Sequence, residues 1–147
     1  MKSELINTNG SGQRTYAMIM DTGDEAMQCL TEFAQQQSLN ACQFTAIGAF
    51  SSALLGYFDF SKKEYEKIEV DEQVEVLVLA GDISFDKGNQ KVHAHVVLGR
   101  SDGSTRGGHL MKGYVRPTLE VMLTESPAHL HRKHDEVSGL ALIDIKG

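Results

Sequence analysis

The feature that most limits the possible folds of this chain is the succession of short β-rich runs that begins at Ala41. Branched and alternating apolar residues are interrupted by turn signals such as Asp86-Lys87-Gly88-Asn89 and Asp102-Gly103, and Asp-Gly is the strongest two-residue hairpin signal. Consecutive strands joined by such turns are antiparallel neighbours. One further β-rich run precedes Ala41, at 13–20. The expected strands are therefore 13–20, 41–46, 52–58, 64–70, 74–85, 91–98, 105–111, 115–125 and 140–145.

One helix is expected, directly after the first strand. Thr22 and Glu25 have the spacing of a capping box, in which each side chain bonds to the other residue's amide. Ala26, Leu30 and Phe33 then follow helical spacing and form one apolar stripe. The pattern predicts the α+β class, with an antiparallel sheet packed against one main helix. The 147 residues suit a single domain over 13–147, after a flexible N-terminus at 1–12.

Composition excludes several classes of protein. Hydrophobic residues make up 41% and charged residues 23% of the chain, which argues against disordered, collagen-like and coiled-coil chains. The longest apolar run, Val76 to Ala80, is far shorter than the roughly 20 residues of a membrane span. The first ten residues are too polar for a signal peptide. We therefore expect a soluble, cytoplasmic protein with no membrane partner.

Charge is unevenly distributed along the chain. The net charge of −6 has the wrong sign for a protein whose main task is to neutralise nucleic-acid phosphates. Residues 87–134 nevertheless hold eight basic and three acidic residues, which gives +5 there and −11 elsewhere. All six histidines lie in the same segment. Polar chemistry is therefore expected in this segment.

Three of these histidines form a candidate metal site. His93 and His95 lie two residues apart, so they share one face of the strand, away from Val92 and Ala94. If Asp102-Gly103 closes a hairpin, His109 lies on the neighbouring strand. Three histidines suit tetrahedral Zn²⁺, whose fourth position is then left to water or a ligand. The alternative is three solvated histidines on an exposed sheet face.

Other polar residues are weaker candidates. Glu120 and Arg116 share the polar face of strand 115–125. Glu120 could hydrogen-bond to a metal-bound histidine, act as a general base or simply be exposed. Arg132 could anchor its loop through Asp135 or bind an anion. Residues His129, His131 and His134 have no assigned role, and no motif for nucleophilic catalysis or phosphate binding occurs in the sequence, so no catalytic residue is assigned.

Several segments of the chain match one family in order. The matching motifs are Ile47-Gly48-Ala49-Phe50-Ser51, the run from Val74 to Ile83, His93-Ala94-His95-Val96-Val97-Leu98, Gly107-Gly108-His109-Leu110, Glu120-Val121-Met122-Leu123 and, in the tail, Arg132, Asp135, Gly139 and Leu140. Together they resemble the plants-and-prokaryotes-conserved (PPC) domain, from about Arg14 to Ile145. The His-x-His motif followed by Gly-Gly-His-Leu is the most specific part of this resemblance.

The resemblance has implications for fold, assembly and ligands. It implies an α+β fold, a homotrimer, and zinc at His93, His95 and His109. Plant relatives bind DNA, but through a separate AT-hook with the sequence Arg-Gly-Arg-Pro. Arg106-Gly107-Gly108 lacks the second arginine and the proline that fit a narrow minor groove, so DNA binding is disfavoured for this chain.

Three functional hypotheses follow. The first is a non-enzymatic homotrimer that binds zinc at the three histidines and a small anionic ligand, with a regulatory role. Self-association is also favoured by the strand from Val74 to Leu79, which is apolar on both faces. The second is an accessory or architectural DNA-binding protein. The third is a zinc-dependent enzyme with Glu120 as its base.

Overall fold

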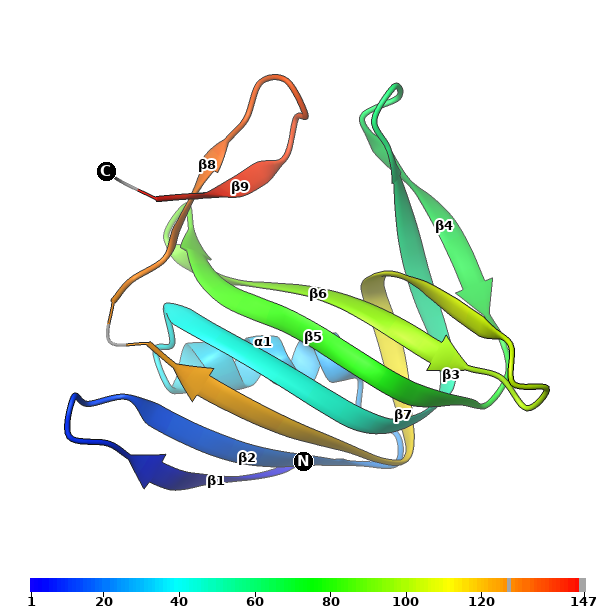
Figure 1. Cartoon of the computed structure of the whole chain (residues 1–147), viewed down its shortest axis with the longest axis horizontal. Helices are drawn as coiled ribbons and strands as arrows, with labels where there is room; N and C mark the ends of the chain where they lie inside the picture. The colour runs from blue at the N-terminus through cyan, green and yellow to red at the C-terminus, as the bar shows by residue number, and fades with distance from the viewer. Residues whose placement is uncertain (127, 146–147) are drawn as a thin grey trace.

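The computed structural model describes residues 1–126 and 128–145. One helix and nine strands lie within these ranges (Figure 1). In chain order they are β1 (Lys2–Thr8), β2 (Arg14–Asp21), α1 (Ala26–Gln36), β3 (Ala41–Asp59), β4 (Glu64–Val70), β5 (Val74–Asp86), β6 (Asn89–Gly99), β7 (Thr105–Glu125), β8 (His131–His134) and β9 (Ala141–Asp144).

The strands form one strongly curved sheet in the order β1-β2-β7-β3-β5-β8-β9. Strand β6 pairs with both β5 and β7, and β3 also pairs with both of them. These four strands therefore close into a ring. Two hairpins, β3–β4 and β8–β9, project as arms on the same side of this ring (Figure 1).

The ring closes because two strands are much longer than the sequence indicates. Strands β3 and β7 have 19 and 21 residues and run through the breaks expected at 47–51 and 112–114. The breaks appear instead as register shifts between β3 and β7, which bend strands without ending them. At Gly48 the φ angle is +152°, and a Cβ atom would lie 2.2 Å from the carbonyl oxygen of Thr118. Only glycine allows this close approach of β3 to β7.

Helix α1 begins slightly later than the capping box predicts. The carboxylate of Glu25 caps it by accepting hydrogen bonds from the amides of Met27 and Gln28, at 3.1 and 2.9 Å. Glu25 also accepts from the amide of Gly113 on β7 at 2.9 Å, so the cap ties the helix to the sheet. Thr22 donates instead to the carbonyl of Pro117. The side chains that the helix buries in the core are Ala26, Leu30, Phe33 and Ala34.

The predicted α+β class, with an antiparallel sheet packed against one main helix, is wrong. About 66% of the residues lie in strands and 8% in the one short helix. The sheet is mixed, because β5 and β8 pair in parallel at Phe85 and His131. Since the sheet curls onto itself, side chains from β2, β3, β5, β6 and β7 supply most of the core. The short helix covers only part of it. It is neither long nor apolar enough to cross a membrane, and it is the one helix in 1–126 and 128–145.

Candidate metal centre

Strands β6 and β7 bring the three predicted histidines together. His95 and His109 are directly opposite each other in the antiparallel register, in a hairpin whose three-residue loop contains Asp102-Gly103. His93 lies two residues before His95 on the same face of β6. Val92, which precedes them, and Ala94, which lies between them, are buried. The predicted alternation of β6 is therefore confirmed. It directs both imidazoles out of the core, toward His109.

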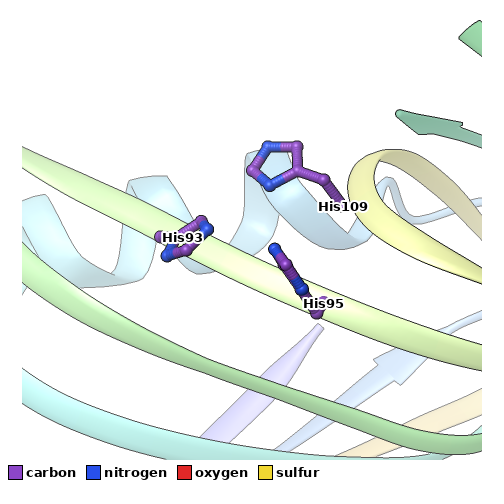
Figure 2. Close-up of side chains that lie close together, drawn as sticks. All are labelled: His93, His95 and His109. Atoms are coloured by element: carbon purple, nitrogen blue, oxygen red, sulfur yellow. The ribbon is translucent and has the colours of Figure 1, made fainter. Parts of the chain in front are cut away.

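The three imidazoles form a compact cluster. Each residue offers one ligand atom, and these atoms all lie within 4.8 Å of one another. The ring centroids of His93 and His95 are 5.0 Å apart, and those of His93 and His109 are 5.2 Å apart. Figure 2 shows the side chains converging from the two strands. Strand register and alternation thus place three nitrogen ligands around one point.

Desolvation favours the neutral form of two of the three imidazoles, those of His95 and His109. Desolvation, together with the neighbouring His93 and His95, lowers the pKa of His109 to about 4. Desolvation and His93 also lower the pKa of His95. The ring of Tyr65 on β4, with its centroid 4.8 Å from that of His109, covers the cluster on one side. A neutral imidazole has a free lone pair, so both rings are ready to bind a metal at neutral pH.

The donor set fits a zinc ion. The Nδ1 atom of His109 is buried, and it has no hydrogen-bond partner among residues 1–126 and 128–145. Metal ligation would satisfy this atom. Two nitrogen ligands of tetrahedral zinc are roughly 3.3 Å apart, so small side-chain rotations within the 4.8 Å cluster suffice to form the site. Three histidines leave one position open.

An acidic residue that the sequence analysis did not select supports the cluster. Asp82 on β5 is paired with His93 on β6, and its Oδ2 atom lies 3.4 Å from Nδ1 of His93. Burial alone would raise the pKa of Asp82, but its contacts with His93 and Arg132 hold the pKa below the usual range. A carboxylate in this place would orient the imidazole through Nδ1 and leave Nε2 for a metal. The sequence contains a signal that could have identified Asp82. Counting back along both strands from the predicted turn at Lys87-Gly88 places residue 82 opposite residue 93.

Arg132 holds Asp82 in place. Its side chain is only 7% exposed and donates to Oδ1 of Asp82 at 2.7 Å. The same guanidinium donates to the Ser84 hydroxyl at 2.7 Å and to the Ala141 carbonyl at 2.8 Å. Arg132 belongs to β8, so these bonds connect the C-terminal hairpin to the histidine cluster through Asp82.

The remaining candidates lie elsewhere. Glu120 lines a separate depression with Ile47 and Leu77, which shares no residue with the pocket beside the histidines. Arg116 is exposed and donates to the side chain of Gln73 at 3.1 Å. The structure therefore brings together His93, His95, His109 and, through Asp82, Arg132. It does not bring Glu120 or Arg116 to them.

The lowered pKa of His109 predicts a pH dependence for the metal-free protein. His109 takes up its proton near pH 4 in the folded state but near pH 6.5 in the unfolded state. Between these values the unfolded chain binds more protons, so stability is highest above pH 6.5 and falls as the pH drops toward 4. We expect urea unfolding to show a loss of about 1–2 kcal/mol between pH 7 and 5 from this group. The variant His109→Phe should lose that part of the pH dependence, and an unchanged dependence would contradict the prediction.

Fold and cluster together define a class: a β-rich domain with one short helix and three histidines gathered on the outside of its sheet. The sequence profile of the Plants and Prokaryotes Conserved (PCC) domain matches residues 7–127. The chain belongs to this family, which confirms the resemblance found in the sequence.

Solved structures of similar chains agree with this assignment. A PPC protein from Pyrococcus horikoshii is 32% identical, with a TM-score of 0.85 over 91% of this chain and 93% of that one. A metal-containing protein from Archaeoglobus fulgidus is 33% identical, with a TM-score of 0.83 over 98% and 97%. A proposed DNA-binding protein from Bacteroides thetaiotaomicron is 25% identical, with a TM-score of 0.86 over 94% of each chain.

One curated relative is much longer than this chain. The bifunctional protein GlmU of a Synechococcus strain is 31% identical over 136 residues. The match covers 90% of this chain but only 21% of the length of that protein.

Proposed function

We propose that this protein is a non-enzymatic, homotrimeric metal-binding protein that holds zinc at His93, His95 and His109. The observation that carries the proposal is the convergence of three ligand atoms within 4.8 Å. The similar chain from Archaeoglobus fulgidus, which is named as metal-containing, supports it. Zinc held in this way would be a Lewis acid with one open position for water or a small anion. A regulatory role would follow if binding of such an anion changed the protein's interactions.

The outer face of the sheet supports self-association. It carries apolar side chains that are 38–61% exposed, contributed by adjacent strands β2, β7, β3, β5 and β6: Ile19, Met122, Ile47, Leu77, Val78 and Val97. Neighbouring strands place these residues on the face opposite the buried core. Exposed apolar residues gathered on one face in this way are typical of an interface, although Glu120 lies opposite both Ile19 and Ile47 on this face. In the proposed trimer, copies of the chain cover it.

Purification without chelator or metal-affinity resin tests the proposal. We expect elemental analysis to find up to one zinc per chain, and light scattering to give three times the 16.2 kDa chain mass. Protein without bound metal, whose thermal stability does not change on addition of Zn²⁺, would overturn the metal part. A mass of one chain at micromolar concentration would overturn the trimer.

DNA binding is the second candidate, because the similar chain from Bacteroides thetaiotaomicron is named as a proposed DNA-binding protein. The net charge of −6 per chain opposes approach to DNA. The +5 segment could attract it locally, since screening over about 8 Å hides the distant acidic residues. Its basic residues, however, are divided among β6, β7, β8 and the turns next to them.

We therefore expect weak binding to random duplex DNA, with a dissociation constant above about 1 µM at about 150 mM salt. Titration of labelled duplexes at several salt concentrations measures it. Submicromolar affinity that is lost on Arg106→Ala or Arg116→Ala substitution would favour the DNA-binding candidate instead. Lys2→Ala, which removes an exposed cation on β1, is the matched control.

A zinc-dependent enzyme was the third hypothesis, with Glu120 as its general base. A general base must lie within hydrogen-bond reach of the proton that it removes. Glu120 lines a different depression from the one beside the histidines, so nothing in the geometry favours this form of the hypothesis.

A further inference from the structure

A pocket of about 450 Å³ lies beside the histidine cluster. His93 and His109 form part of its wall, and the rest comes from α1, from strands β4 to β9 and from the turn between β8 and β9. Most of that lining is apolar: Met27 of α1, Tyr65 of β4, Leu110 and Met111 of β7, and Leu142 of β9. Pockets of this size hold small organic molecules, which a few polar groups orient among apolar side chains.

The charges in the pocket favour an anion near the histidines. Arg132 also lines it, but the bonds to Asp82, Ser84 and the Ala141 carbonyl occupy its guanidinium. Lys91 is exposed and forms no ion pair within 1–126 and 128–145. It lies two residues before His93 on β6, about 7 Å away along the strand. Its ammonium group is therefore available to a ligand at the cluster.

The one carboxylate of the lining, that of Asp86, lies at the opposite end of the pocket. Asp86 is opposite Asn89 in the strand register, next to the β5–β6 turn. This level is roughly 13 Å along the strand from that of His93. Negative charge is thus disfavoured at that end and favoured near Lys91. A zinc ion bound by three neutral histidines would keep its full +2 charge. This charge would further favour a negatively charged ligand group near the histidines.

We propose that this pocket binds a small organic monocarboxylate with an apolar body. One carboxylate oxygen takes the open position of the metal, and the Lys91 ammonium group pairs with the carboxylate. The hydrocarbon part lies against Met27, Met111 and Leu142. A single charged head fits better than a phosphate, because only one unpaired cation lines the pocket in the described part of the chain. This inference rests on the proposed metal centre.

Cobalt-substituted protein tests the inference, because the visible spectrum of Co²⁺ reports a change of ligand at its open position. Acetate, butyrate and hexanoate are titrated, with 1-hexanol as the uncharged probe. Each buried CH₂ group should strengthen binding about fourfold, so hexanoate should bind at least tenfold more tightly than acetate and change the spectrum. Hexanol should leave the spectrum unchanged.

Two matched lysine variants test the role of Lys91. Lys91→Met should weaken hexanoate binding at least fivefold. Lys112→Met removes the same charge from a different depression of β7 and should leave the affinity within twofold. Leu142→Gln, at a side chain that is already 45% exposed, should reduce the advantage of hexanoate over acetate without unfolding the protein.

The outcomes separate this inference from the proposed function. If cobalt binds at one ion per chain but hexanoate binds no more tightly than acetate, or does not change the spectrum, the carboxylate site is wrong and the metal centre stands. If no metal binds to the three histidines, both fail. An equal loss of affinity in Lys91→Met and Lys112→Met would also overturn the assignment, since it would show only a general effect of charge.

Discussion

Replacing His109 by alanine will abolish the stoichiometric zinc binding that we propose. The imidazole of His109 is the one contribution of β7 to the cluster, and its buried Nδ1 atom has no partner among the described residues. The two remaining ligands, His93 and His95, make a weak site. We expect affinity for Zn²⁺ to fall by roughly 100-fold or more. Isothermal titration calorimetry, with elemental analysis of the purified protein, measures the loss.

His134→Ala is the matched control. His134 is an exposed histidine on β8 and does not belong to the cluster, so its removal should leave zinc affinity unchanged. Asp82→Asn should give an intermediate result, with the affinity for Zn²⁺ lowered about 10- to 100-fold. This substitution replaces the carboxylate that orients His93 by a neutral amide. Equal affinity in the His109→Ala variant and the unmodified protein would show that zinc binds elsewhere.

The double substitution Ile47→Glu and Leu77→Glu will convert the proposed trimer to a monomer. Both side chains are more than half exposed, and they line one depression with the carboxylates of Glu75 and Glu120. Two more carboxylates there would repel those already present and would have to be buried in an apolar interface. Since neither side chain lies in the core, the chain should remain folded. Light scattering measures the mass, and circular dichroism verifies the fold.

Val137→Glu provides the comparison for this experiment. Val137 is 69% exposed and lies in the turn between β8 and β9, away from the apolar face of the sheet. This variant should stay trimeric. A double variant that keeps the mass of the unmodified trimer would show that another surface forms the interface.

The residues of the candidate site could be selected from the sequence because their arrangement is local. The two-residue period of β6 places His93 and His95 on one face, and the Asp102-Gly103 turn brings His109 next to them. Periodicity and turn chemistry act over a few residues, so they can be recognised without the rest of the fold. Asp82 was within reach of the same reasoning, through the register set by the neighbouring turn.

Other features depend on contacts between distant segments. Nothing near residue 132 in the sequence indicates that the side chain of Arg132 reaches Asp82, 50 positions earlier. Likewise, Glu120 shares a strand with His109, but β7 is long and bent, so the two residues lie beside different depressions. Alternation along a strand indicates which face a side chain takes. It does not indicate how far two residues on that face are separated.

The sequence by itself determined the family, the predominance of β-strand segments and the position of the helix. It also determined which face of its strand each histidine takes. Motifs and hydrophobic periods are properties of short segments, so they can be recognised in the sequence alone. Only the tertiary structure decided that the sheet closes through β3, β5, β6 and β7, and that β8 joins it in parallel. Register shifts and a close approach at Gly48 let β3 and β7 continue where turns were expected. Their effect depends on the strand that lies opposite, and a single sequence specifies that partner only through the packing of the whole chain.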